Sequence, residues 1–76
     1  MKTLLIRGSH EPPAELRRIV NGGSTEVAEV ARREDARGGD IDRVVEWTGR
    51  EVLLEDRRLR WPEDEDELRM LFETGG

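Results

Sequence analysis

The residues with the clearest chemical potential are Gly75 and Gly76, the last two of the sequence. Glycine has no side chain and few backbone restrictions, so such a tail can thread a narrow enzyme channel and present its carboxylate to ATP. A carboxylate activated there can pass to sulfur, to a thiol or to an amine. Two terminal glycines also serve as a helix cap or a frayed end. The elements that precede them must decide between these interpretations.

The composition predicts one small, highly charged domain that is not an enzyme. The 76 residues are 34% hydrophobic and 41% charged, with a formal net charge of −5, and a core of this size is marginal. The absence of cysteine excludes disulfides, thiolate metal sites and a nucleophilic thiol. His10 lies in a Gly/Pro-flanked turn with no Ser, Cys or metal-ligand spacing near it, which favours a surface histidine. We therefore expect no catalytic residue, no metal and no cofactor.

The charge pattern argues against nucleic acid as a partner. Arg57, Arg58 and Arg60 cluster, but an acidic run over residues 63–67 follows at once and offsets their field. Both runs are typical of a solvated surface. The apolar run near the N-terminus is too short for a signal peptide or a membrane span. We therefore expect a cytoplasmic protein without membrane contact.

Hydrophobic spacing predicts the elements of the N-terminal half. Residues Lys2–Arg7 are typical of a strand. Residues Ala14–Val20 fit either a short helix or a hairpin partner for that strand. The best predicted helix covers Ser24–Arg37, where Val27 and Val30 share one narrow apolar face. A strand there would send those two valines to opposite faces, which favours the helix.

The C-terminal half is predicted to be mostly extended. Residues Ile41–Thr48 and Glu51–Leu54 form two strands joined by a glycine turn, and residues Arg58–Trp61 form a short extended piece. The final segment alternates apolar and polar residues over 68–73, which favours a last strand. The alternative is a helix over Glu63–Thr74 with a proline near its start.

In this order the elements resemble the β-grasp fold of ubiquitin and of the bacterial sulfur-carrier proteins. The segments that carry the resemblance are STEVAEVARRED for a capped central helix, DRVVEWTGREV for a strand, glycine turn and strand, LLEDRRL for the connector, and DEDELRMLFETGG for the last turn, strand and tail. The resemblance implies an α+β fold whose mixed sheet wraps on one central helix. It also implies a single domain over residues 1–74 and a flexible tail at Gly75-Gly76.

The resemblance implies that Gly76 is the reactive residue and that Gly75 keeps the tail slim. In the first interpretation an ATP-dependent activating enzyme adenylates Gly76, and the protein becomes a modifier of target amines. Its partners are then that enzyme, a conjugating enzyme, a deconjugating peptidase and target proteins. In the second, Gly76 carries the thiocarboxylate of a sulfur carrier. In the third, the protein is a small non-covalent interaction module, an interpretation that gains if residues 14–20 and the last segment are both helices.

Four further residues are candidate partner contacts: Phe72, Glu46, Trp47 and Arg50. Glu46 occupies the position where the resemblance places an exposed isoleucine that many partners of ubiquitin contact. Tryptophans serve as partner anchors, although core packing is favoured for at least one of Trp47 and Trp61.

Overall fold

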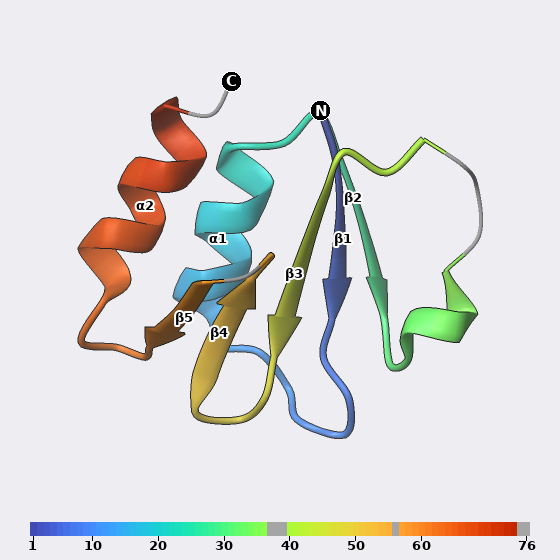
Figure 1. Cartoon of the computed structure of the whole chain (residues 1–76), viewed down its shortest axis with the longest axis horizontal. Helices are drawn as coiled ribbons and strands as arrows, with labels where there is room; N and C mark the ends of the chain where they lie inside the picture. Colours follow the sequence, from blue (N-terminus) through green and yellow to red (C-terminus); the bar gives the residue numbers. More distant parts are fainter. Residues whose placement is uncertain (37–39, 56, 75–76) are drawn as a thin grey trace.

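A five-stranded mixed sheet forms one layer of the protein and two α-helices form the other (Figure 1). The computed structural model describes residues 1–36, 40–55 and 57–74. The elements are β1 (Lys2–Ile6), α1 (Ala14–Gly22), β2 (Glu26–Val30), the 3-10 turn η1 (Arg33–Asp35), β3 (Arg43–Trp47), β4 (Glu51–Leu54), β5 (Arg57–Arg60) and α2 (Glu65–Thr74). The strand order is β2-β1-β3-β4-β5.

Strand β1 occupies the interior of the sheet, which explains its unbroken apolar sequence. It pairs in parallel with β2 on one side and with β3 on the other. All side chains from Thr3 to Ile6 are buried, as expected for a strand covered on both faces. Parallel neighbours need crossover connections. Helix α1 supplies the first, and residues 31–42, which include η1, supply the second.

Residues 14–22 form helix α1, so the hairpin alternative for this segment is wrong. Leu16, Ile19 and Val20 are all buried, and their spacing of three and four residues places them on one face of the helix. The helix ends where the backbone N–H of Gly23 donates to the carbonyl of Ile19, at 3.2 Å. Burial of this face against the sheet stabilises a helix that is too short to persist alone.

The last segment is helix α2, so the predicted final strand is wrong and the helical alternative is confirmed. Leu68 and Phe72 are buried one helical turn apart, whereas Met70, between them, is 62% exposed. The alternation of Leu68, Met70 and Phe72 therefore has no structural role. The spacing of Leu68, Leu71 and Phe72 decides the conformation, because all three pack in or against the core.

The predicted helix over Ser24–Arg37 is also wrong, because residues 26–30 form the edge strand β2. Val27 packs against the core beneath the helices, and strand alternation sends Val30 to the opposite face. Both side chains are only half-buried. A strand does place the two valines on opposite faces of the sheet, as the sequence analysis argued. This does not exclude a strand, because each valine is half-buried on its own face.

The remaining strand predictions are confirmed, with small changes at the ends of β1, β3 and β5. The free edge of β5 is blunted by the turn that follows it. The backbone N–H of Arg60 donates to Oδ2 of Asp64 at 2.8 Å, and the carbonyl of Arg60 accepts the N–H of Asp64, also at 2.8 Å. Both edge-facing groups of Arg60 are thus satisfied within the chain.

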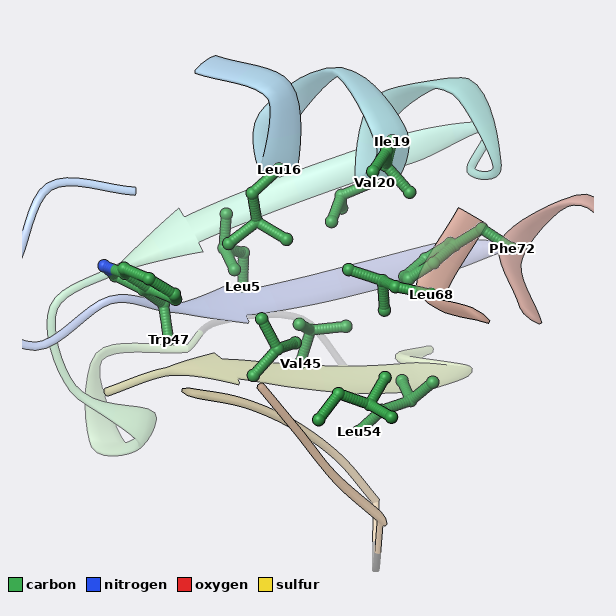
Figure 2. Close-up of a cluster of buried hydrophobic side chains, with 11 residues drawn as sticks. Leu5, Leu16, Ile19, Val20, Val45, Trp47, Leu54, Leu68 and Phe72 are labelled. Atoms are coloured by element: carbon green, nitrogen blue, oxygen red, sulfur yellow. The ribbon is translucent and has the colours of Figure 1, made fainter. Parts of the chain in front are cut away.

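The main core lies between the sheet and the two helices (Figure 2). Leu5 and Val45 come from the sheet, Leu16 from α1 and Phe72 from α2. The predicted α+β class with a mixed sheet packed on helix is confirmed, and the arrangement is consistent with a β-grasp-like fold. It does not by itself identify a ubiquitin-like protein, because α1 joins β1 and β2 as parallel neighbours and α2 adds a second helix.

Candidate partner-binding site

The structure assigns two of the predicted contact residues to the core. Phe72 is 2% exposed and Trp47 is 6% exposed, so neither offers its ring to a partner. The prediction that at least one tryptophan packs in the core is confirmed. Gly75 and Gly76, the predicted site of activation, lie outside the described residues.

The other two predicted contacts, Glu46 and Arg50, are both exposed, but they lie on different parts of the fold. Glu46 pairs across strands with Leu53, on the sheet face that alternation turns away from the helices. Arg50 lies in the turn between β3 and β4 and lines a surface pocket. Of these two residues, Arg50 is the one that lines a pocket described here.

A tight turn fixes the position of Arg50. Its geometry needs Gly49, whose φ of 101° lies in the region that other residues rarely adopt. The hydroxyl of Thr48 accepts the backbone N–H of Glu51 at 3.0 Å. The carbonyl of Arg50 accepts the N–H of Trp61 at 3.3 Å, so the turn is tied directly to the residue that follows β5.

Trp61 is positioned by this hydrogen bond and by an aromatic contact. Its ring meets that of Trp47 edge to face, with the centroids 6.5 Å apart and the planes at 84°, a favoured geometry for aromatic pairs. Trp61 is half-buried and packs against the core. It also lines the open pocket of about 530 Å³, here called the Trp61 pocket, whose lining residues are Gly49, Arg50, Glu51, Arg60, Trp61 and Glu63.

The Trp61 pocket exposes two guanidinium groups that form no ion pair with another described residue. These are the side chains of Arg50 and Arg60, both of which are exposed. The lining also holds two carboxylates, those of Glu51 and Glu63. Glu51 also faces Arg58 outside the pocket, with Oε1 at 3.8 Å from Nε.

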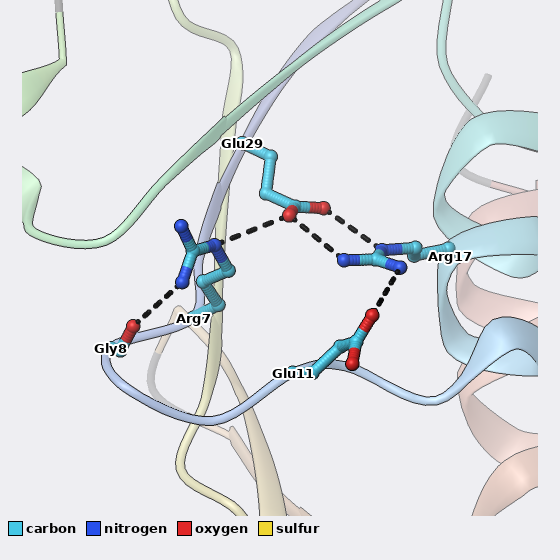
Figure 3. A network of polar contacts seen from close by, with 5 residues as sticks. All are labelled: Arg7, Gly8, Glu11, Arg17 and Glu29. Atoms are coloured by element: carbon cyan, nitrogen blue, oxygen red, sulfur yellow. Dashed lines mark hydrogen bonds and ion pairs between the residues drawn. The ribbon is translucent and has the colours of Figure 1, made fainter.

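A second polar cluster, formed around Glu29 on β2, is by contrast internally balanced (Figure 3). Arg17 of α1 donates to both carboxylate oxygens of Glu29, at 3.1 and 3.0 Å. Arg7 approaches Glu29 at 3.3 Å, and Glu11 approaches Arg17 at 3.5 Å. The hydrogen bond with Glu29 is the main cause that raises the pKa of Arg17 above its usual value, while desolvation opposes it. This cluster ties α1 to the sheet edge and leaves no charge for a ligand.

The Trp61 pocket presents groups that can bind an anion. Its side chains provide guanidinium groups, an aromatic wall and carboxylates, with no hydroxyl, thiol or imidazole in the lining. No group of three or more His, Cys, Asp or Glu residues in the described part of the chain could hold a metal ion. Over the same residues, neither α-helix has the length and apolar character needed to cross a membrane.

The sequence analysis did not predict that Arg60 and Trp61 lie close to Arg50. Trp61 was a candidate anchor and Arg60 belonged to an arginine cluster, but nothing joined them to Arg50. The register between β4 and β5, which sets Glu51 opposite Arg60, brings them together. Counting the register of the β4–β5 hairpin outward from its turn could have predicted that these residues lie together.

Comparisons with models of protein families, with curated proteins and with solved structures found no match. Function is therefore inferred from the Trp61 pocket and the charges around it.

Proposed function

We propose that this protein is a small non-covalent interaction module that binds an acidic segment of a partner protein in the Trp61 pocket. The observation that carries the proposal is the placement of Arg50 and Arg60, which form no ion pairs among the described residues, beside a half-buried tryptophan. Arginine and tryptophan are the side chains that most often dominate binding energy at interfaces. Guanidinium groups also bind carboxylates through two parallel hydrogen bonds.

The net charge of −5 does not oppose this assignment at physiological salt. The Debye length there is about 8 Å, so exposed charges beyond that distance are largely screened. An incoming carboxylate therefore responds mainly to the two guanidinium groups and to the carboxylates of Glu51 and Glu63. The same net charge remains a reason against extended contact with nucleic acid, which requires many phosphate contacts.

The secondary structure supports the interaction module over the interpretations in which the Gly-Gly tail follows a final strand. The interaction module was the interpretation favoured if residues 14–20 and the last segment were both helical, and α1 and α2 meet that condition. Phe72 lies in the core two residues before the end of α2. The chain is thus packed against the domain to within a few residues of Gly75-Gly76.

The proposal is tested by tryptophan fluorescence in a Trp47→Phe background, where Trp61 is the sole indole. A peptide of alternating aspartate and glutamate should give a saturable change in emission, and its asparagine–glutamine counterpart should not. Arg50→Gln and Arg60→Gln should each weaken binding about 1.5- to 5-fold, the range expected for an exposed ion pair. The control is Arg33→Gln, an exposed arginine on η1 at the other edge of the sheet.

Three results would overturn the proposal. These are no saturable response, an equal response to the neutral peptide, and equal losses in the Arg33→Gln control. A response to single-stranded oligonucleotide that exceeds the response to the acidic peptide would assign the pocket to nucleic acid instead.

Covalent attachment or sulfur transfer through Gly76 is the alternative drawn from the sequence. Removal of Gly75-Gly76 separates it from the module, which should keep its affinity for the acidic peptide. Mass spectrometry of host lysate then examines the alternative directly. Trypsin cleavage after Arg69 would leave Met70–Gly76 on target lysines if the protein is a modifier, and an oxygen-for-sulfur exchange at Gly76 would mark a sulfur carrier.

A further inference from the structure

A smaller pocket lies near the other end of β5, about 190 Å³ in volume and lined by Arg43, Leu54, Glu55, Arg57 and Leu71. These residues come from the start of β3, the end of β4, the start of β5 and helix α2. Two leucines supply apolar walls and two arginines supply the charge. We call it the Arg43 pocket, and no residue of it belongs to the Trp61 pocket.

The Arg43 side chain is positioned but not neutralised. Its guanidinium carbon lies 4.7 Å from the centroid of the Phe72 ring, a cation–π contact with a buried aromatic residue. Its Nη1 atom is buried and has no hydrogen-bond partner among the described residues. A buried donor without a partner is costly, and a native structure rarely keeps one without a reason.

Arg57 adds a second positive charge whose own pairing is weak. Its Nη1 lies 3.8 Å from Oε1 of Glu67, and both side chains are more than half exposed. Such pairs contribute little in water. Among the described lining residues Glu55 is the one carboxylate, and it is exposed. Within the described lining, two guanidinium groups thus face a space with one competing carboxylate.

The backbone at the rim of this pocket forms the turn that joins β4 to β5. Glu55 begins this turn with a φ of 58°, the only positive value at a non-glycine residue in the described part of the chain. Tight hairpin turns commonly need a positive φ. The conformation brings the end of β4 and the start of β5 around the rim of the pocket.

We propose that the Arg43 pocket binds a small oxyanion, a carboxylate or phosphate group, between Arg43 and Arg57. The volume equals that of roughly six water molecules, enough for one such group. The cation–π contact with Phe72 holds the Arg43 guanidinium in place, and a guanidinium can bind an oxyanion through two parallel hydrogen bonds. This site is independent of the Trp61 pocket and of the function proposed for it.

The test is a two-dimensional ¹⁵N–¹H NMR titration of the full chain with sodium acetate and with sodium phosphate. Sodium chloride at matched ionic strength is the reference. We expect saturable shifts of the amides of Leu54, Glu55 and Leu71 and of the Arg43 Nε–H. Saturation by acetate alone assigns a carboxylate ligand, saturation by phosphate alone assigns a phosphate group, and saturation by both assigns a general oxyanion site.

Matched substitutions make the result decisive. Arg57→Gln should weaken the binding about tenfold, whereas Arg58→Gln should leave it unchanged, because alternation turns Arg58 to the opposite face of β5. Arg43→Lys keeps the charge but loses the planar fork, and it should also weaken binding about tenfold. The exposed Arg57 carries the test if variants of Arg43 do not fold. Shifts that are equal in chloride, do not saturate, or persist in Arg57→Gln would overturn the proposal.

Discussion

The contact between Gly23 and Phe72 yields a quantitative prediction about how closely α1 and α2 pack. A Cβ atom added to Gly23 would lie 2.6 Å from Cβ of Phe72, and 2.8 Å from its Cδ1 and from its carbonyl oxygen. Ordinary carbon–carbon contacts are about 3.5–4.0 Å, so the two helices would have to separate by roughly 1 Å. Rotation of the Phe72 ring cannot relieve this clash, because Cβ and the carbonyl move only with the backbone of α2.

We expect Gly23→Ala to lower the free energy of unfolding by about 1–3 kcal/mol, the usual cost of overpacking. The native φ of −99° at Gly23 is accessible to alanine, so no backbone strain adds to this value. Gly22 is the matched control, since nothing lies within 4 Å of its added Cβ. Gly22→Ala should be neutral or stabilising by up to about 1 kcal/mol, through the loss of chain entropy in the unfolded state.

The assay is urea denaturation followed by far-UV circular dichroism, with thermal unfolding as a second measure. For a domain of this size, a loss of 1 kcal/mol lowers the Tm by about 4–8 °C. Gly23→Ala should therefore melt well below both the parent protein and Gly22→Ala. Equal stability of the two alanine variants would refute the close approach of α1 to α2.

Three further predictions concern the core, the edge of the sheet and the polar cluster. Leu16→Ala removes a fully buried side chain from α1 and should cost about 2–5 kcal/mol in urea denaturation, and a loss below 1 kcal/mol would contradict the assigned core. Asp64→Ala frees the edge-facing N–H of Arg60 and should lower stability by about 1 kcal/mol. It should also promote self-association in sedimentation analysis, and an unchanged monomer would argue against the edge-capping role. Because Glu29 raises the pKa of Arg17, the contribution of that charge is complete below the unfolded-state pKa and is lost only as pH rises through the folded value. The destabilisation by Arg17→Gln should thus be equal at pH 6 and pH 9, and a difference would show that another group controls the cluster.

The sequence predicted the antiparallel half of the sheet well, because local signals are sufficient there. The glycine turn at Gly49 and the flanking apolar residues define β3 and β4 without help from distant parts of the chain. The parallel half was harder. Whether residues 26–30 form a strand depends on β1, which lies more than twenty residues away in the sequence, and the spacing of Val27 and Val30 fits a helix equally well.

The candidate site was only partly predictable for a similar reason. Arg50 was predicted as a candidate contact, and it lies in a turn, where residues are generally exposed. Trp47 and Trp61 are equivalent in sequence terms, and only the packing of β3 beneath the helices buries the first and leaves the second at the surface. The arginines of β5 looked like one cluster, yet alternation sends Arg57 towards one pocket and Arg60 towards the other.

The interior position of β1 has a consequence for the order in which the chain can fold. Strand β1 pairs on one side with residues 26–30 and on the other with residues 43–46, both of which follow it in the sequence. Its apolar residues are therefore not fully covered until both of these segments have been synthesised. Contacts of such long sequence separation slow folding, and transiently exposed apolar strands promote aggregation. Nascent chains that carry β1 without its two partner strands are therefore the stage at which aggregation is most favoured.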